Sequence, residues 1–508
     1  MINDNNNYCW FLLGPTGIGK TFVSLKIGQK FNNQIINTDA FSLYKEASIM
    51  TAKATKKEMS LVHHRMINIL DLFDINYHQK LFKKDALNEI NSIIQNGQTP
   101  LIVGGTNYFV ESILFNYENE NILENNNEIN GNNNPIELLE KNEYIKNLKI
   151  IDKNFLNDII SIKNENKDED GCYTKISNYL NENFNEKNNN KKELIKILSI
   201  IDEKSSNFYN DNDIRRIINS ISFYITYNKK KSDMLNNQII KLNFKKNKII
   251  ILLPSNIDDL LKRITSRIDE MIEEGLSEII YIFNKFILNK KEINFEVGVL
   301  QSIGYKEFYE LYQNLNNNLI NDIYNTHLKA IMDDNDEQLK EFNKNILENI
   351  IYKDEKLKNI FDNCRQKLIN NTLNYAKYQI KFIKKRIMPY ITGYKIIEIK
   401  DFKKEIYINE YIPQIVDYLN NNEFISIINN DKNKMEEWKR YYCDICKCEL
   451  NGDNNYNLHM KSNKHKKQKD KLRKKLKAQK PVDKQDDVNE INEKLSKISI
   501  SNSNPDNL

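Results

Sequence analysis

The fold is decided by residues 10–21, which read WFLLGPTGIGKT. An apolar run leads directly into the pattern G-x-x-x-x-G-K-T, and residues 22–27 continue with an amphipathic pattern. This order predicts a buried strand, a phosphate-binding loop and a helix. We therefore expect an α/β fold in which a parallel sheet, like that of P-loop nucleotide-binding proteins, carries the loop at its edge.

The residue types of this loop suit a bound phosphate group. Glycines permit the backbone conformations that turn successive N–H groups toward an anion, and the start of the following helix adds partial positive charge. Lys20 is expected to reach the phosphates and Thr21 to ligate Mg²⁺. The predicted phosphate-binding residues are Gly14, Pro15, Thr16, Gly17, Ile18, Gly19, Lys20 and Thr21. The motif indicates the ligand class, usually a nucleotide such as ATP, and leaves the reaction open.

Composition limits the class of protein. The chain has 508 residues, with 75 basic and 70 acidic side chains and a net charge of +5, which is enough chain for two or three modules with sizeable cores. Six cysteines, three of them clustered at 443, 446 and 448, do not form a secreted disulfide framework and indicate a reducing compartment. No apolar run approaches transmembrane length, and a first strand near Tyr8 leaves no room for a signal peptide. We expect a cytoplasmic monomer without membrane contact, with the nucleus and the mitochondrion left open.

Two further predicted strands end in polar residues. Residues 34–39 form a short apolar run that ends in Asp39, and residues 101–103 lead into Gly104, Gly105 and Thr106. In P-loop folds these strand ends face the phosphate site, so Asp39 is a candidate acid or base and Thr106 a candidate phosphate donor. The alternatives are a turn or cap role for Asp39 and an ordinary strand-to-helix connection for Thr106.

The middle of the chain divides by composition. Residues 117–192 are rich in Asn and Glu and predict a partly disordered insertion, interrupted by a short helix at 173–180. The following residues are mostly helical by period, with a strand at 249–253 and a helix at 257–274 that ends at Gly275. The expected domains are 8–116 for the first part of the core, 117–192 for the insertion, 193–437 for the helical part and the rest of the core, 438–470 for a zinc finger, and 471–508 for a basic and then disordered tail.

Two arginine pairs stand out in the helical part. Arg215 and Arg216 follow an aspartate, and Arg263 and Arg267 lie four residues apart on one predicted helix. Such side chains either bind anions or remain solvated and salt-bridged, and the sequence leaves both readings open.

The C-terminal part contains a metal-binding pattern. Two cysteines separated by two residues are followed after twelve residues by a histidine and after five more by a second histidine. This spacing predicts a structural Zn²⁺ site, because so short a module has no core without the metal. The predicted ligands are Cys443, Cys446, His459 and His465, with Cys448 outside the site and with Tyr442 and Leu458 as core residues. Residues 461–480 hold eleven Lys or Arg and one Asp, which predicts phosphate contact, with a solvated charge run or a nuclear targeting signal as the alternatives.

Taken in order, these residues resemble the tRNA dimethylallyltransferase family, of the eukaryotic type that ends in a zinc finger. The resemblance covers about residues 8–420 apart from the insertions. The matching segments are 14–21, Asn37-Thr38-Asp39, Tyr44-Lys45, Thr51-Ala52-Lys53, His63-His64, Gly104-Gly105-Thr106-Asn107-Tyr108, NDIRRI at 212–217, the helix from Arg263 to Leu276, IGYKE at 303–307 and YAKYQ at 375–379.

The resemblance implies transfer of a dimethylallyl group from its diphosphate to the exocyclic amine of the adenosine 3′ of a tRNA anticodon. The P-loop then holds the leaving diphosphate with Mg²⁺ in place of ATP, Asp39 accepts the proton from the amine, and the adenosine leaves its stack. The partners are dimethylallyl diphosphate and the tRNA anticodon stem-loop. The implied tRNA contacts are Tyr44, Lys53, Arg215, Arg216, Arg263, Arg267, Lys377 and Gln379.

The chain departs from the family pattern at several positions. Ala40 and Ser42 follow Asp39 where Ser and Gln are usual, and Asn219 replaces an arginine; in the late block Leu373 and Tyr378 replace basic residues and Phe382 replaces a tryptophan. These changes remove expected phosphate and RNA contacts. The alternatives are therefore a catalytically weakened RNA-binding paralogue, an adenylate dimethylallyltransferase, against which the finger and basic tail argue, and a P-loop kinase of small metabolites.

Overall fold

A computed structural model describes residues 8–119, 153–165, 169–184, 191–210, 212–236, 238–333, 336–428, 439–479 and 501–502. The chain divides into two compact units. The first unit comprises residues 1–117 and 240–430, and the second comprises residues 118–239 and 431–508. In the part of the chain that the structure describes, no helix is long and apolar enough to cross a membrane.

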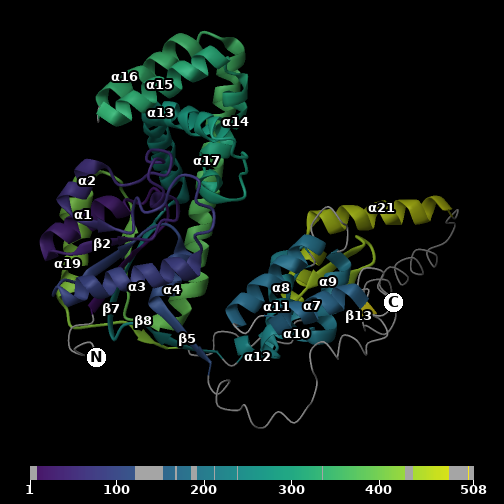
Figure 1. The fold of residues 1–508 in the computed structure, drawn as a ribbon. Coiled ribbons are helices and arrows are strands. Elements are labelled where there is room, and N and C mark those ends of the chain that lie inside the picture. The colour runs from purple at the N-terminus through teal and green to yellow at the C-terminus, as the bar shows by residue number, and fades with distance from the viewer. Residues whose placement is uncertain are drawn as a thin grey trace. The chain divides into compact units, whose positions relative to one another are not determined.

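The centre of the first unit is a six-stranded parallel sheet with the order β3-β2-β4-β1-β7-β9 (Figure 1). Its strands are β1 (Tyr8–Leu13), β2 (Gln34–Asn37), β3 (His64–Arg65), β4 (Pro100–Val103), β7 (Lys246–Pro254) and β9 (Lys395–Ile399). Strand β1 lies between β4 and β7 and is buried from Cys9 to Leu13, as expected for a parallel strand covered on both faces. The predicted α/β fold with a parallel core is confirmed.

Helices cover this sheet. Helix α1 packs on β1 and on α19, whereas α3 packs on β2, β4 and α4. Their bounds are α1 Lys20–Phe31, α2 Lys56–Leu61, α3 Gln79–Gln95, α4 Asn107–Leu114, α18 Lys404–Ile406 and α19 Ile412–Asn420. Shorter elements of the first unit are η1 Phe41–Leu43, η3 Gly298–Gln301, η4 Leu347–Ile351, η5 Ile383–Ile387, η6 Met388–Tyr390, η7 Tyr407–Tyr411, β8 Ile391–Thr392 and β10 Ser426–Ile427.

A group of long helices extends from the sheet, at the top of Figure 1. They are α13 (Ile257–Leu288), α14 (Tyr305–Asn314), α15 (Asn317–Asp333), α16 (Asp336–Ile346) and α17 (Glu355–Phe382). Helix α13 packs against α15, α16 and α17, and α17 runs from this group back to the sheet (Figure 1). We call these five helices the helical arm.

The predicted helix end at Gly275 is wrong, because α13 continues through this residue to Leu288. A Cβ atom at position 275 would lie 2.7 Å from Cγ2 of Ile49. The glycine therefore allows the loop around Ile49 to approach α13, a role that a sequence pattern does not distinguish from a helix cap.

The second unit contains a helical domain, of which the sequence predicted some helices but not the domain as a whole. Its helices are α7 (Lys153–Glu165), α8 (Glu169–Asn183), α9 (Lys191–Ile201), α10 (Glu203–Phe208), α11 (Ile214–Tyr227) and α12 (Lys231–Asn236). Four buried side chains, at Cys172, Ile176, Leu180 and Phe184, form a stripe at four-residue spacing that packs on α11. This stripe makes residues 169–184 an ordered domain despite their polar composition.

The predicted boundary between residues 192 and 193 is therefore misplaced. Helices α9 to α12 belong with α7 and α8, and residues from 240 onward return to the first unit. Strands β5 (Phe115–Asn119) and β6 (Gln238–Leu242) pair with each other where the chain leaves and re-enters that unit. Of the insertion predicted to be disordered, residues 120–152 lie outside the described residues.

The C-terminal elements are β11 (Arg440–Cys443), β12 (Cys448–Asn451), α20 (Asp453–Lys461), α21 (Asn463–Gln479) and β13 (Ser501–Asn502). Strands β11 and β12 form an antiparallel hairpin in which Cys443 lies opposite Cys448. Helices α20 and α21 follow the hairpin, as in a ββα zinc module with an extended final helix.

Candidate active site and zinc finger

The P-loop connects β1 to α1 as predicted. Gly17 and Gly19 have φ angles of 81° and 88°, in the left-handed region that glycine favours. Both positions are also crowded, because a Cβ at Gly17 would lie 2.9 Å from Cγ1 of Ile264 and one at Gly19 would lie 2.8 Å from the hydroxyl of Tyr407. The loop thus has the backbone conformation and the helix N-terminus that bind phosphate groups.

Lys20 lies over this loop. Its Nζ donates hydrogen bonds to the carbonyl oxygens of Gly14 and Pro15, at 2.8 Å each. Burial lowers the pKa of Lys20 to about 7, against the opposing effect of the Asp39 carboxylate. A phosphate group here would favour the charged lysine. Thr21 follows in the first turn of α1, and its hydroxyl oxygen is the type of ligand that Mg²⁺ prefers.

Asp39 lies just beyond the end of β2, where it makes the turn contact that the sequence left open, while its role as an acid or base stays a prediction. Its Oδ1 accepts a hydrogen bond from the backbone N–H of Phe41 at 3.1 Å, which is the turn contact. Its Oδ2 lies beside Gly105, where a Cβ atom would approach to 2.9 Å. Burial raises the pKa of Asp39 above its usual value, while the Phe41 hydrogen bond and the charge of Lys20 oppose that shift. A half-buried carboxylate with a raised pKa beside a phosphate loop is a candidate general base.

Thr106 reaches the same place from the third strand end. Its Oγ1 accepts a hydrogen bond from the backbone N–H of Ala40 at 3.0 Å, and its own N–H donates to the carbonyl of Thr38 at 3.1 Å. These bonds hold the turn that carries Asp39. A phosphate contact by Thr106 stays a prediction.

Helix α17 closes the site from the side of the helical arm. Gln379, which is 1% exposed, accepts a hydrogen bond from the N–H of Thr16 at 2.7 Å and donates one to the carbonyl of Gly105 at 2.8 Å. Tyr375 donates to the same carbonyl at 3.1 Å. Contrary to the predicted tRNA contact, the structure places the amide of Gln379 inside the protein, where it joins the P-loop to the Gly105 turn.

Tyr407 is a site residue that no sequence motif indicated. Its hydroxyl donates to the carbonyl of Ile18 within the P-loop at 2.7 Å, and its ring packs on Gly19. Only the return of the chain to β9 and η7, almost 400 positions after the loop, brings this tyrosine there.

One of the four candidate arginines, Arg267, lies at this site, with Arg263 beside it on the same helix. Arg267 on α13 is half-buried, and its Nη1 lies 3.5 Å from Oγ1 of Thr16. Burial and the neighbouring Arg263 lower the pKa of Arg267, whereas Asp39 raises it. Arg263 is exposed one turn earlier. The loop therefore has a second cation besides Lys20.

Arg215 and Arg216 lie in the other unit. Both are exposed on α11, and Arg216 forms a solvent-exposed ion pair with Asp213 at 3.5 Å. Such a pair contributes little to stability, so these arginines remain available to an anionic partner. Lys377 is likewise exposed, on α17.

Tyr44 and Lys53, also predicted to contact tRNA, lie inside the loop between η1 and α2. The Tyr44 hydroxyl donates to the carbonyl of Asp74 at 2.9 Å. The Nζ of Lys53 donates to the carbonyls of Tyr44 and Lys45 and to Oδ1 of Asn68. Burial lowers the pKa of Lys53 to about 8. Because an ammonium group has three donors and all three are used here, the structure contradicts the tRNA contact predicted for Lys53.

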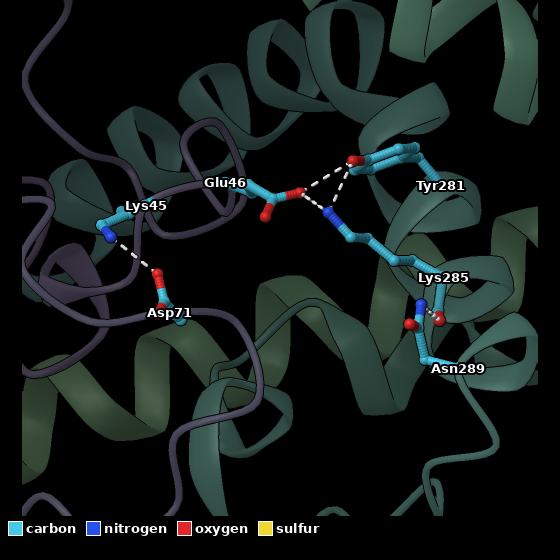
Figure 2. A network of polar contacts seen from close by, with 6 residues as sticks. All are labelled: Lys45, Glu46, Asp71, Tyr281, Lys285 and Asn289. Carbon is cyan, nitrogen blue, oxygen red and sulfur yellow. Dashed lines mark hydrogen bonds and ion pairs between the residues drawn. The ribbon is translucent and has the colours of Figure 1, made fainter.

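The same loop is attached to the helical arm through Glu46. Figure 2 shows its carboxylate accepting from the Tyr281 hydroxyl, at 2.7 Å, and from the Lys285 ammonium group. Lys285 also donates to the Tyr281 hydroxyl at 3.0 Å, and Lys45 pairs with Asp71 on the solvent side. Sequence reasoning missed this network, since Glu46 lies more than 200 positions from Tyr281 and Lys285.

The same loop also makes hydrogen bonds to a carboxylate that belongs to α13. Glu278, only 2% exposed, accepts from the backbone N–H groups of Ser48, Ile49 and Met50 at 2.9, 2.8 and 3.0 Å. Burial raises the pKa of Glu278, and the three amides oppose the shift. The segment that follows Asp39 is thus fixed on α13, the helix that also carries Arg267.

The four predicted zinc ligands come together in the second unit. The ligand atoms of Cys443, Cys446, His459 and His465 all lie within 4.8 Å of one another. Nδ1 of His465 lies 3.5 Å from both sulfurs and 3.1 Å from Nε2 of His459. Two thiolates and two imidazoles at this spacing fit tetrahedral Zn²⁺.

The small core of this module differs from the prediction. Leu458 is 68% exposed, whereas the rings of Tyr441 and Tyr456 stack at 4.5 Å between the hairpin and α20. Leu458 points outward because its helix turns His459 and Tyr456 toward the hairpin instead. The prediction for Leu458 was therefore wrong.

A phosphate-binding loop that faces a half-buried carboxylate, on one chain with a Cys₂His₂ module, defines a P-loop group-transfer protein with an attached zinc finger. The chain belongs to the IPP transferase family, whose model matches residues 42–167 and 153–386. A second family, described as zinc-finger double-stranded RNA-binding, matches residues 440–466.

Curated relatives extend over most of the chain. The tRNA dimethylallyltransferase of Saccharomyces cerevisiae is 25% identical over 483 residues, covering 90% of both chains. The human tRNA dimethylallyltransferase is 24% identical over 89% of this chain and 84% of the relative. A crystal structure of a eukaryotic dimethylallyltransferase acting on tRNA matches 93% of this chain and 99% of the other, with a TM-score of 0.59 and 21% identity. The structural likeness supports the same fold.

Proposed function

We propose that this protein is a tRNA dimethylallyltransferase. It transfers a dimethylallyl group from dimethylallyl diphosphate to the exocyclic amine of the adenosine immediately 3′ of the anticodon, giving isopentenyladenosine. Membership of the IPP transferase family and the activity named for relatives of nearly full length support this reaction. The observation that carries it is the geometry of the site: Gln379 joins Thr16 of the P-loop to Gly105, beside the carboxylate of Asp39, and Arg267 lies at the same threonine.

The reaction balances with groups of this site. The amine nitrogen of the adenosine attacks the first carbon of the dimethylallyl group, so that a C–N bond forms. The C–O bond to the diphosphate breaks, and the leaving oxygen keeps the electron pair. The proton lost from the nitrogen passes to the carboxylate of Asp39. Its raised pKa makes this carboxylate a better base than an exposed aspartate.

The loop stabilises the leaving group. Negative charge grows on the diphosphate as the C–O bond breaks, and the loop amides, Lys20 and Arg267 lie where they stabilise this charge. Thr21 would hold Mg²⁺, which supplies further neutralisation of the diphosphate when bound. Gln379 keeps the loop at a constant distance from the Gly105 turn through its two hydrogen bonds.

The accessory module supports a large RNA acceptor. The adenosine must leave its stack to reach Asp39, which costs free energy that contacts elsewhere on the RNA offset. A zinc finger followed by the basic helix α21 supplies such contacts to phosphates, whereas a free nucleotide needs none. We further propose action in the cytoplasm, in agreement with the free cysteines of the described residues; the monomeric state stays a prediction.

A single assay tests the reaction. Purified protein with Mg²⁺ and labelled dimethylallyl diphosphate is offered tRNA, AMP, or candidate small-molecule acceptors with ATP in separate tubes. We expect label on tRNA alone, and a tRNA in which guanosine replaces the target adenosine is the control. Label on AMP but never on tRNA would overturn the proposal in favour of a nucleotide prenyltransferase.

A further inference from the structure

Helix α17 presents a row of aromatic side chains beside the active site. Tyr375, Tyr378 and Phe382 lie on one face of the helix, at spacings of three and four residues. Tyr375 and Tyr378 are nearly parallel with ring centroids 6.3 Å apart, and Tyr378 and Phe382 are 6.2 Å apart. Tyr108, from α4, meets Phe382 edge-on at 4.8 Å. We call these four residues the aromatic ladder.

The ladder begins beside Asp39, and two of its members are exposed to solvent, whereas Phe382 is buried. Tyr375 donates to the carbonyl of Gly105, beside the carboxylate of Asp39; burial raises the pKa of Tyr375, and the Asp39 carboxylate adds to this shift. Tyr108 and Tyr378 are 41% and 46% exposed. Tyr375 is half-buried, so Tyr108 and Tyr378 are the members of the ladder whose rings are open to a base.

Positive charge lies along the same part of the helix. Lys377 and Lys381 on α17, and Lys384 and Lys385 just beyond its end, are all exposed. Arg386 lies 5.5 Å from the centre of the Phe382 ring and is held there by hydrogen bonds to Glu111. Exposed rings interspersed with cations are the surface that binds single-stranded nucleic acid, because bases stack on the rings and the cations contact phosphates.

We propose that Tyr108 and Tyr378 form a stacking platform for an unpaired base of the RNA substrate, next to the nucleotide delivered to Asp39. This inference rests on the proposed function. It also accounts for a departure from the family pattern, since Tyr378 stands where a basic residue is usual.

The platform predicts a particular response to substitution. Tyr378→Ala, in the full-length protein, weakens binding of an anticodon stem-loop RNA about tenfold and leaves the slope of log affinity against log salt unchanged. Tyr378→Phe keeps the affinity, because the ring and not the hydroxyl stacks. Tyr378→Arg steepens the salt slope by about 0.7–0.9, the value of one added phosphate contact.

The control is Tyr352→Ala. Tyr352 is also 46% exposed, but it lies before the opposite end of α17, at least about 35 Å away along the helix axis. This variant binds the RNA as tightly as the wild type does. A melting temperature close to that of the wild type, for this variant and for Tyr378→Ala, confirms that both retain the fold.

Stacking is observed directly with 2-aminopurine placed in the RNA beside the target adenosine. The fluorescence of 2-aminopurine is quenched when this base stacks. The bound RNA is quenched in the wild type and in Tyr378→Phe, and is brighter in Tyr378→Ala. Equal quenching and affinity in wild type and Tyr378→Ala, or a salt slope changed by Tyr378→Ala, would overturn the platform. Failure of the wild type to modify tRNA would instead overturn the proposed function, so the two failures are distinguishable.

Discussion

Replacing Glu278 by Gln tests how the helical arm holds the loop that follows Asp39. The carboxylate accepts three backbone N–H groups at 2.8–3.0 Å from residues 48–50, and its Oε1 also lies 3.3 Å from the Tyr305 hydroxyl. A carboxamide has one acceptor oxygen in place of two, so at least one buried amide loses its partner. The substitution keeps the size of the side chain, removes its charge and replaces one acceptor oxygen by an NH₂ donor group.

The magnitude follows from these contacts. A hydrogen bond to a charged group contributes about 1.5–3 kcal/mol, and a buried donor left without a partner costs about 1–3 kcal/mol. Burying a neutral side chain in place of a carboxylate offsets part of this loss, because burial disfavours the charged form of Glu278. We expect a loss of about 2–3 kcal/mol, which corresponds to a fall in melting temperature of roughly 3–5 °C for a unit of about 300 residues.

The measurement is differential scanning calorimetry of the full-length protein beside a matched variant. Glu274→Gln makes the same chemical change one turn earlier on α13, at an exposed residue whose partner is Lys340, and is expected to shift the transition by at most about 2 °C. Prenyl transfer by Glu278→Gln is expected to decline as well, since the released loop begins close to Asp39. Indistinguishable melting of the two variants would refute the clamp by Glu278.

Three further predictions concern the two sites directly. Asp39→Asn abolishes transfer and leaves tRNA affinity within about twofold in filter binding, and turnover by this variant would remove Asp39 as the base. In the wild type, the transfer rate falls as the pH decreases through the pKa of Asp39, because the protonated carboxyl cannot accept the proton. Since that pKa is raised, the fall occurs at a higher pH than for an ordinary aspartate. Gln379→Ala leaves the N–H of Thr16 without its acceptor and lowers kcat about tenfold or more with tRNA affinity retained; a change in tRNA affinity alone would instead restore the originally predicted contact. Cys443→Ser, or removal of zinc by a chelator, unfolds the finger, weakens tRNA binding and flattens the salt dependence of that binding. The rate of single-turnover transfer at saturating tRNA is unchanged. A binding isotherm identical to that of the wild type would mean that the finger serves another partner.

Patterns local in sequence determined the main elements of this protein. The run of residues 10–21 specifies strand, loop and helix because the apolar period, the glycines and the lysine act within a few positions of one another. The zinc site follows in the same way from four side chains within 23 residues, and the structure brings all four ligand atoms together. The parallel core, the P-loop and the finger were therefore predictable from the chain alone.

Local patterns failed where composition and distance misled them. The stripe at Cys172, Ile176, Leu180 and Phe184 was hidden among Asn and Glu residues, so this segment was predicted as a short helix within a partly disordered insertion and not as part of a helical domain. Gly275 had the sequence character of a helix cap, yet it lies inside α13 because the Ile49 loop approaches there. In both cases tertiary packing outweighed the local preference.

Tertiary structure alone decided which polar side chains serve the site and which face solvent. Sequence could name Lys53 and Gln379 as residues of interest, but both are used in internal hydrogen bonds. The partners of Lys53 lie within 15 positions of it, whereas Thr16, the partner of Gln379, lies 363 positions away. Tyr407 and Glu278 were not visible at all, since their partners lie 389 and about 230 positions away. The physical reason is that a motif records the chemistry of neighbouring residues, whereas the free energy of a buried polar group depends on partners that only the folded chain brings within hydrogen-bonding distance.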